Sequence, residues 1–327
     1  MSQSTKTIFI TGVAGFIGYF TALRLLKEGY RVVGIDNMNT YYAPELKALR
    51  REKLIEAGLE FHLGDIKDAS VLKSIFHMQH FDTVIHLAAQ AGVRHSTNNP
   101  IQFVEDNIYG LVNVLECVRE YPCKLLFASS SSVYGKNKDF PYKESDSVDN
   151  PASFYAATKS AGELLAKSYH NLHGIAMYGL RFFTVYGPMG RPDMAYFSFA
   201  EKMMKGEPIE VFNYGNMERD FTYIDDIVEG IIAGVKAIKE GEFELFNLGG
   251  DHTYKIGDLI HHLEENLGKK AQVIMRPTPL GDVEKTCGDI TKASIAFDYR
   301  PQIELKEGIE KFCAWYQSWI KAHAHHV

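Results

Sequence analysis

Three glycines with the spacing GxxGxxG constrain the fold of this chain more than any other feature. Gly12, Gly15 and Gly18 directly follow a short apolar, β-branched run, Thr7–Thr11, which is typical of a buried strand. They open a segment, Phe16–Glu28, whose apolar residues recur with helical periodicity. Glycines here permit a tight turn and let backbone N–H groups approach a phosphate, and the helix N-terminus adds partial positive charge. A glycine-rich pattern alone also fits an ordinary packing turn, so its surroundings decide between the two.

A carboxylate ends the second predicted strand. The run Arg31–Asp36 completes a strand–helix–strand unit, and Asp36 lies 18 positions beyond Gly18. A carboxylate there accepts hydrogen bonds from the adenosine ribose hydroxyls and repels a 2′-phosphate, which favours NAD over NADP. Asp65 follows a third strand, Leu59–Leu63, and is placed to meet the adenine amino group, unless it is an ordinary loop residue. Other residues expected to line the cofactor are Phe16, Ile17, Asn37 and Ile66.

Strands and helices continue to alternate as far as Gly187. Further strands are expected at Thr83–Ala88, Lys124–Ser129 and Ile175–Phe182, and helices at Ile101–Glu120 and Ser153–His173. This alternation predicts an α/β fold with a Rossmann-type doubly wound parallel sheet. Residues 1–187 are expected to form an NAD-binding Rossmann domain.

Beyond Gly187 the elements become shorter, with more glycine and proline. Residues 188–327 are expected to form mainly a smaller C-terminal α/β substrate lobe, interleaved with the last strands of the Rossmann sheet. The elements predicted there are helices at Ala195–Lys205, Asp225–Ile238, Ile256–Leu267 and Leu305–Ala322, and strands at Ile209–Phe212 and Leu245–Leu248.

Composition excludes several classes of function. The net charge of −6 and the lack of a basic stripe give no case for nucleic-acid binding. No apolar run approaches the roughly 18–20 residues that cross a bilayer, and no signal peptide is visible, so neither a membrane partner nor export is expected. The four cysteines are widely spaced without a CxxC pair, which indicates reduced thiols and a cytoplasmic location. The histidines near the C-terminus, at 323, 325 and 326, are interpreted as a solvated tail, and no metal site is predicted.

Tyr155 and Lys159 are the candidate catalytic pair. They lie four residues apart in a predicted helix and therefore share one face. To act as a base at pH 7, a tyrosine needs its pKa lowered by about three units, or about 4 kcal/mol. A neighbouring ammonium and an oxidised nicotinamide both supply the positive charge required. The preceding strand ends in a run of serines at 129–132, and a serine at the carboxyl end of such a strand points into the ligand crevice. A hydrolase GxSxG elbow is absent.

The glycine loop, the serine cluster and the YxxxK pair, in this order, resemble the extended short-chain dehydrogenase/reductase family over nearly the whole chain. The resemblance implies that Ser130, Tyr155 and Lys159 are catalytic and that Lys159 also bonds the nicotinamide ribose. It further implies that Leu87, Ala88 and Ala89 line the cofactor pocket, with Asn107 nearby.

The residues after Ser130 distinguish among branches of this family. Sugar-nucleotide 4,6-dehydratases carry an Asp-Glu pair there as acid and base, whereas this chain has Ser131 and Ser132. Decarboxylating UDP-glucuronate enzymes usually place Glu where Ser132 stands. Both departures favour simple epimerisation.

Three further segments resemble the UDP-glucuronate 4-epimerases in particular: His86–Arg94, Leu180–Met194 and Tyr214–Gly230. Arg191 falls in the sugar-facing loop, where a guanidinium can hold a carboxylate bidentately. Thr184 stands where UDP-galactose 4-epimerases have Asn, and its hydroxyl could assist in binding the carboxylate. By resemblance, Arg219 is the diphosphate ligand and Asp282 a uridine-side ligand. Arg94 and Met194 complete the expected substrate set.

The resemblance thus implies an isomerase that converts UDP-glucuronate to UDP-galacturonate through a transient 4-keto intermediate, with tightly held NAD. A UDP-glucuronate decarboxylase, another UDP-hexose 4-epimerase and a non-catalytic NAD-sensing protein remain alternatives. The family also implies a homodimer formed through the two long helices near Ile101–Glu120 and Ser153–His173.

Overall fold

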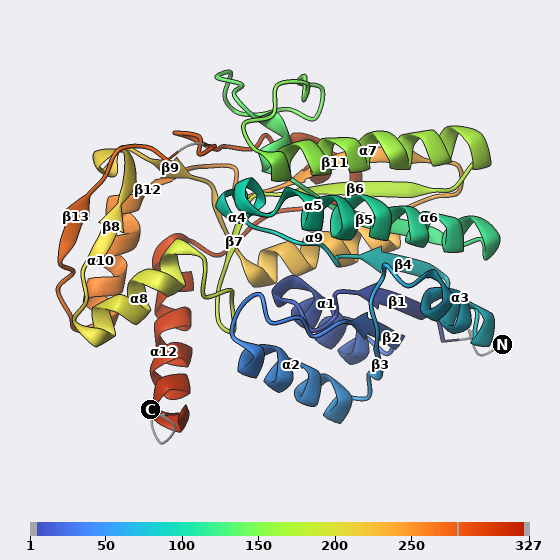
Figure 1. The fold of residues 1–327 in the computed structure, drawn as a ribbon, viewed down its shortest axis with the longest axis horizontal. Helices are drawn as coiled ribbons and strands as arrows, with labels where there is room; N and C mark the ends of the chain where they lie inside the picture. The colour runs from blue at the N-terminus through green and yellow to red at the C-terminus, as the bar shows by residue number, and fades with distance from the viewer. Residues whose placement is uncertain (1–4, 280, 324–327) are drawn as a thin grey trace.

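A seven-stranded parallel sheet forms the centre of the computed structural model, which describes residues 5–279 and 281–323 (Figure 1). Its strand order is β11-β6-β5-β4-β1-β2-β3, and every neighbouring pair is parallel. The strands are β1 Thr7–Thr11, β2 Arg31–Asp36, β3 Glu60–Leu63, β4 Thr83–His86, β5 Lys124–Ser130, β6 Met177–Phe182 and β11 Phe243–Leu248. The central strands are buried on both faces, as expected for a sheet covered by helices on each side. The predicted Rossmann-type sheet is confirmed.

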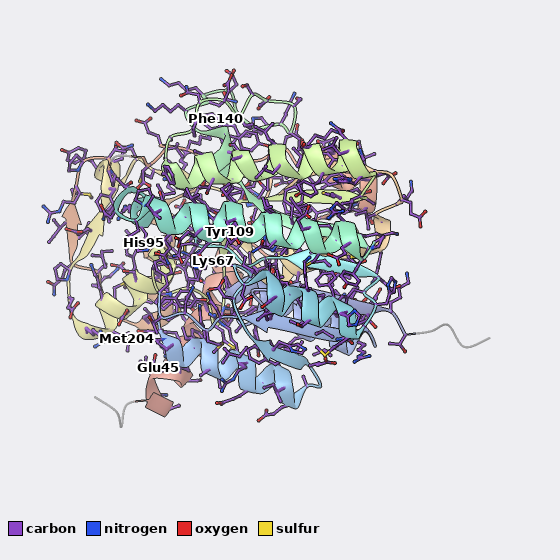
Figure 2. The ribbon with its side chains drawn as sticks, turned by 45° about the vertical axis from the view of Figure 1, so that its right-hand side comes forward. Glu45, Lys67, His95, Tyr109, Phe140 and Met204 are labelled. Atoms are coloured by element: carbon purple, nitrogen blue, oxygen red, sulfur yellow. The ribbon has the colours of Figure 1, made fainter. Side chains whose placement is uncertain are left out.

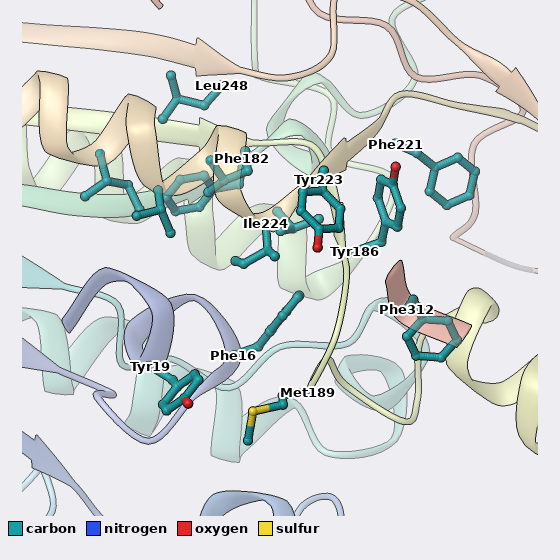
Figure 3. Packing of buried hydrophobic residues seen from close by; sticks show 14 of the residues in the cluster. Phe16, Tyr19, Phe182, Tyr186, Met189, Phe221, Tyr223, Ile224, Leu248 and Phe312 are labelled. Carbon is teal, nitrogen blue, oxygen red and sulfur yellow. The ribbon is translucent and has the colours of Figure 1, made fainter. Parts of the chain in front are cut away.

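Two layers of helices cover this sheet (Figure 1). One layer consists of α1 Phe16–Lys27, α2 Pro44–Glu56, α9 Ile224–Ala237 and α11 Thr291–Phe297. The opposite layer consists of α3 Ala69–Met78, α4 Val93–Asn98, α5 Pro100–Val104, the π-helical turn η1 Glu105–Tyr109, α6 Gly110–Glu120 and α7 Phe154–His173. Each layer packs its apolar side chains on its own face of the sheet, which gives two large buried clusters. The first cluster continues into the C-terminal part of the chain, and Figure 3 shows some of the aromatic residues that fill it.

A group of shorter elements lies beyond the carboxyl edge of the sheet (Figure 1). It contains β7 Thr184–Tyr186, α8 Ala195–Lys205, β8 Ile209–Val211, β9 Glu218–Arg219, β10 Phe221–Tyr223, β12 Tyr254–Lys255, α10 Ile256–Leu267, β13 Val273–Met275 and α12 Leu305–His323. Three two-stranded ladders, β10–β7, β12–β9 and β13–β8, connect segments that are far apart in the sequence. The chain returns to the main sheet between these elements, because α9 and β11 belong to the Rossmann part.

The predicted elements differ from the structure mainly at their ends and in the short pieces. The strand predicted at Thr83–Ala88 ends at His86, and the long helix predicted at Ile101–Glu120 contains the π-helical turn. Four helices, α2, α3, α4 and α11, were not predicted. The sequence of α2 is rich in charge and weakly amphipathic, whereas α3 carries a detectable signal, since its N-cap Asp68 accepts hydrogen bonds from two backbone N–H groups. Strands of only two or three residues are hard to predict from periodicity, because they are shorter than one repeat of a recognisable pattern, and five of them were missed: β7, β9, β10, β12 and β13.

A buried ion pair fastens α7 to the sheet. Arg181 on β6 donates from Nε and Nη2 to the two carboxylate oxygens of Glu163 on α7, each at 2.8 Å, and the two side chains are only 2% and 6% exposed. Ser129 on β5 also donates to Glu163, at 2.5 Å, and Arg181 donates to the hydroxyl of Tyr134 at 3.0 Å. All polar atoms of the carboxylate are therefore satisfied, which a buried charge requires. The position of α7 against β5 and β6 depends on this network.

We expect Glu163→Gln to lower the free energy of unfolding by about 3–5 kcal/mol, because it leaves the Arg181 charge buried without its counter-charge. Glu201→Gln, which breaks an exposed ion pair with Lys205 on α8, is the matched control and should cost less than about 1 kcal/mol. Urea unfolding of the two variants measures both effects. Equal losses would show that the buried pair contributes no more than a surface pair.

Candidate functional site

A long groove crosses the carboxyl ends of β1, β2, β4 and β5. It contains every predicted cofactor residue except Asn107: Gly12, Gly15, Phe16, Ile17, Gly18, Asp36, Asn37, Asp65, Ile66, Leu87, Ala88, Ala89 and Lys159. Asp36 and Asp65 lie where β2 and β3 end, whereas Ser130 and Tyr155 come from β5 and α7. The groove therefore joins the acidic residues beyond β2 and β3 to the candidate catalytic pair, with the glycine loop between them.

The glycine loop has no room for side chains. Gly12 has a φ of +71°, and a Cβ on it would lie 2.7 Å from the backbone nitrogen of Ala88. A Cβ on Gly18 would overlap the carbonyl oxygen of Gly12. The helix α1 then begins at Phe16 with no side-chain cap and no acidic residue in its first turn. Its first N–H groups and its dipole are thus available to an anion, as a pyrophosphate requires.

Asp36 is fixed by the backbone around it. Its two carboxylate oxygens accept hydrogen bonds from the N–H groups of Ala14, at 3.0 Å, and Met38, at 2.8 Å. Lys47 of α2 is buried beside it and donates to the side-chain oxygen of Asn39 at 2.6 Å. Burial lowers the pKa of Lys47, and the charge of Asp36 opposes that shift. Lys47 lines the groove and was not predicted.

Asn107 lies beside the groove and not in its wall, so its contact with the cofactor stays a prediction. Its side-chain oxygen accepts from the N–H of Gln90 at 2.8 Å, and its nitrogen donates to the carbonyl of Gln90 and the hydroxyl of Thr158, each at 3.0 Å. These bonds hold the loop after β4 against α7. The neighbouring residue, Asp106, lines the groove in its place.

The candidate catalytic residues meet where the groove joins a second cavity. Lys159 donates from Nζ to the carbonyl of Ala128 at 2.9 Å. Burial lowers the pKa of Lys159 to about 8, and the charge of Glu163 opposes that shift. Burial raises the pKa of Tyr155, whereas a hydrogen bond with Ser130 and the charge of Arg191 lower it. Ser130 and Tyr155 line both cavities, so a substrate in one can face a cofactor in the other.

The second cavity contains the whole predicted substrate set. It lies between the sheet and the C-terminal elements and is lined by Arg94, Ser130, Tyr155, Thr184, Arg191, Met194, Arg219 and Asp282, among others. These residues come from α4, β5, α7, β7, the loop after β7, β9 and the segment after β13. Tertiary structure alone brings them together.

Arg219 is held by neutral groups. Its guanidinium donates to the carbonyl oxygens of Glu218, Val283 and Glu284 at 2.9, 2.7 and 3.0 Å. Burial lowers the pKa of Arg219, and the nearby charge of Asp282 opposes that shift. A guanidinium whose described hydrogen-bond partners are carbonyl oxygens and the sulfur of Met217 keeps a positive charge at the cavity, which suits a phosphate group.

The other two arginines of this cavity are paired with carboxylates. Arg191 donates from Nε and Nη2 to the two oxygens of Asp193, at 3.1 and 2.5 Å. Arg94 lies over the ring of Phe212 and donates to Asp282 at 3.1 Å, so two predicted substrate residues contact each other. The pairing with Asp193 fixes the plane of the Arg191 guanidinium.

Sequence reasoning missed a set of residues that line the two cavities: Asn39, Tyr41, Tyr42, Lys47, Gln90, Asp106, Phe183, Asp193, Lys202 and Phe212. The polar and aromatic stretch at 37–42 was the available signal, because it directly follows the strand that ends in Asp36.

Neither a metal centre nor a membrane span marks this site. Among the described residues, one group of potential metal ligands, His261, His262 and Glu265, comes within 4.8 Å, but it lies on α10 outside both cavities. Of the terminal histidines, 325 and 326 lie outside the described residues. No helix in the described ranges combines the length and apolar character needed to cross a bilayer.

Comparison with known proteins agrees with this geometry. A family model described as GDP-mannose 4,6 dehydratase matches residues 9–312. UDP-glucuronate 4-epimerase 4 of Arabidopsis thaliana is 43% identical over 331 residues, which cover 96% of this chain and 76% of that protein. The chain belongs to this epimerase/dehydratase family. The family predicted from the glycine loop, the serine cluster and the YxxxK pair is therefore confirmed.

Solved structures of this family superpose closely on the chain. UDP-glucuronic acid 4-epimerase of Bacillus cereus, in complex with UDP-glucuronic acid and NAD, has a TM-score of 0.90 and is 35% identical, with 96% of this chain and 99% of that chain covered. UDP-glucose 4-epimerase of Thermotoga maritima, with UDP-glucose, has a TM-score of 0.87 and is 29% identical, with coverage of 96% and 99%.

We expect Gly18→Ala to weaken binding of a dinucleotide by about 1–3 kcal/mol, or about fivefold to 150-fold, because the new methyl group displaces the Gly12 carbonyl and with it the loop. Gly257→Ala on α10 is the control, since its methyl group would meet no atom within 4 Å. Calorimetric titration of the purified variants with a dinucleotide measures the affinity of each. Unchanged affinity in Gly18→Ala would remove the close-packing argument.

Proposed function

We propose that this chain catalyses the NAD-dependent 4-epimerisation of UDP-glucuronate to UDP-galacturonate. One observation carries the proposal: Arg219, Arg191 and Thr184 line one cavity, and Ser130 and Tyr155 stand between that cavity and a groove suited to a dinucleotide. The relatives named above support the substrate and the cofactor. When bound, NAD supplies a reversible hydride acceptor for C4 of the sugar.

The groove residues account for retention of the cofactor. Gly12, Gly15 and Gly18, with the uncapped N-terminus of α1, hold the pyrophosphate. Asp36 binds the adenosine ribose, and Lys159 binds the nicotinamide ribose in addition to its bond with Ala128. Residues 1–187 thus supply most of the cofactor site, whereas residues 188–327 supply much of the sugar-nucleotide site.

Tyr155 is the proton acceptor. Its phenolate removes the proton from the C4 hydroxyl, and Ser130, which hydrogen-bonds to Tyr155, relays part of that transfer. Lys159 holds a proton whose pKa of about 8 is close to neutrality. The Lys159 ammonium therefore stabilises the Tyr155 phenolate, and the phenol that forms when Tyr155 takes the C4 hydroxyl proton returns that proton to the C4 oxygen when the 4-keto sugar is reduced.

Epimerisation also requires the sugar to present its other face. Arg219 keeps the diphosphate in place through a guanidinium that is itself fixed by three carbonyls. The 4-keto sugar can then rotate about its diphosphate linkage while the nucleotide stays bound. Return of the hydrogen to the opposite face of C4 gives the epimer.

The carboxylate of the substrate creates a hazard that the site must avoid. A 4-keto uronic acid is a β-keto acid, and it loses CO2 when the C5–carboxylate bond aligns with the carbonyl π system. Arg191 and Thr184 hold the carboxylate charged and out of that alignment. Ser131 and Ser132 offer hydroxyl groups where an acid and base for elimination would otherwise stand.

We also propose that the protein is a homodimer. Large apolar side chains remain exposed along α5, η1 and α7: Ile101, Val104, Tyr109, Phe154, Leu164 and Leu172. These helices run side by side on one outer layer, where Tyr109 can be located in Figure 2. A second copy that brings the same layer face to face would bury these side chains in an isologous interface.

Incubation of the purified protein with UDP-glucuronate and no added NAD tests the proposed function. The expected product has the mass of the substrate and separates from it as UDP-galacturonate, because the cofactor is retained and recycled. A product lighter by CO2 would identify a decarboxylase instead, and no turnover at all would contradict an enzymatic role.

In the same assay we expect Arg191→Ala to reduce turnover of UDP-glucuronate at least a hundredfold, by about 2.7 kcal/mol or more. Any residual product should include UDP-pentose, because the carboxylate is no longer held out of alignment. Arg300→Ala removes an exposed arginine paired with Asp298 and should retain full activity. Full uronate turnover by Arg191→Ala would rule out the carboxylate clamp.

For the dimer, we expect the double variant Leu164→Glu with Leu172→Glu to sediment as a monomer, because both leucines are 72% exposed on the proposed interface. Ile295→Glu is the control, since that residue is 82% exposed on α11, away from these helices. Analytical ultracentrifugation gives the masses. A monomeric wild-type protein would disprove the proposal directly.

A further inference from the structure

Arg50 of α2 is a buried cation that has no acidic partner among the residues the structure describes. Its side chain is 0% exposed. Nη1 donates to the carbonyl of Ala14 at 3.1 Å and to the hydroxyl of Tyr42 at 2.9 Å, and Nη2 donates to the carbonyls of Gly190, at 3.1 Å, and Met189. None of these partners carries a negative charge. A charge buried in this way costs solvation energy, so its hydrogen bonds must fix something that the fold needs.

The partners of Arg50 belong to the two binding sites. Ala14 lies inside the glycine loop of the cofactor groove, whereas Met189 and Gly190 immediately precede Arg191 in the substrate cavity. Arg50 itself lines neither cavity. It therefore acts as a bridge between a loop that holds the dinucleotide and a turn that places the arginine facing the sugar.

The turn that Arg50 binds is strained and tightly enclosed. Met189 has a φ of +53°, which is unfavourable for a residue with a side chain, and its side chain lies in the same buried cluster as Phe16 and Tyr19 of α1 (Figure 3). A Cβ on Gly190 would overlap the hydroxyl of Tyr196. Such a conformation persists only where its surroundings impose it, and the two hydrogen bonds from Nη2 of Arg50 do so here.

A second contact joins the same two segments. Asp193, which pairs with Arg191, also accepts a hydrogen bond from the hydroxyl of Tyr41 at 3.3 Å. Tyr41 lies in the stretch that leads from Asp36 into α2, and it lines both cavities. The segments 37–50 and 187–194 are thus connected both in the core, through Arg50, and at the cavity wall, through Tyr41.

We propose that Arg50 is a positioning residue that sets the register of the Arg191 turn against the glycine loop, and so aligns the sugar end of the substrate with the cofactor. This inference rests on the proposed function, because it assigns Arg191 to the substrate. The proposal also predicts that the sugar and the cofactor lose their alignment when Arg50 is replaced by a cation that cannot reach both Ala14 and Gly190. Lysine keeps the charge but has a single nitrogen with which to span Ala14 and Gly190.

Arg50→Lys and Arg51→Lys form a matched pair of variants. Arg51 is the next residue on α2, and it is partly exposed and pairs only loosely with Glu52, at 3.8 Å. Binding of UDP-glucuronate and of UDP is measured by calorimetry for each variant. In Arg50→Lys we expect the affinity for UDP-glucuronate to fall about tenfold or more, with UDP affected less than about twofold, because UDP reaches Arg219 and not Arg191. Arg51→Lys should match the wild type for both ligands.

Hydrogen exchange of the protein without substrate tests the positioning role of Arg50 separately from the proposed function, because it does not depend on which substrate binds. Backbone amides at 187–194 should exchange about tenfold faster in Arg50→Lys than in Arg51→Lys, while amides of α10 exchange equally in both. If exchange at 187–194 is unchanged, or if UDP and UDP-glucuronate lose affinity equally, the positioning role is wrong. If these amides exchange faster in Arg50→Lys but the wild type does not bind UDP-glucuronate, the positioning role of Arg50 is supported and the proposed substrate is wrong.

Tyr42→Phe keeps the test decisive if Arg50→Lys does not fold. That substitution removes the hydroxyl that orients Nη1 and leaves the buried guanidinium in place. Exchange at 187–194 should rise in the same direction by a smaller factor, of about two to three. No change in this variant would overturn the proposal.

Discussion

The ion pair between Glu163 and Arg181 is the interaction on which the site geometry depends. Ser130 comes from β5, whereas Tyr155 and Lys159 come from α7, and nothing in the local chain holds these two elements at a given distance. Glu163 lies one helical turn beyond Lys159 and is bound by Arg181 of β6 and Ser129 of β5. The same carboxylate raises the pKa of Lys159 against the effect of burial. One buried carboxylate therefore holds the helix against the sheet and opposes the lowering of the Lys159 pKa by burial.

The arginines of the molecule differ by what surrounds them. Arg219 and Arg50 are both bound by carbonyl groups, but Arg219 faces a cavity and can receive an anion, whereas Arg50 is enclosed and can only orient its neighbours. Arg191 is paired with Asp193, which fixes the plane of its guanidinium. A protein of net charge −6 thus presents a few isolated cations, placed by the fold, to a cavity.

Prediction from the sequence succeeded where a signal is local and repeated. The strand–glycine–helix unit and the long helix that carries Tyr155 both have periodic apolar residues, and the structure places them close to the predicted ranges. Prediction failed for α2 because that helix buries Lys47 and Arg50, two residues that a pattern of apolar positions counts as exposed. It also did not identify Asp106, which lines the groove from the π-helical turn, whereas Asn107 on the same turn bonds to Gln90 of the loop after β4.

The sequence by itself determined the glycine loop and the candidate pair of Tyr155 and Lys159, because spacing in the chain controls them: glycines within one loop, and a tyrosine and lysine one helical turn apart. Only the tertiary structure decided the substrate cavity, because its residues come from segments as distant as Arg94 and Asp282, which no periodicity connects. The contact that Arg50 makes between two loops was likewise decided only by the tertiary structure. A buried guanidinium contacting Ala14 on one side and Gly190 on the other is a property of packing, and it becomes visible only when α2 is set between the two loops.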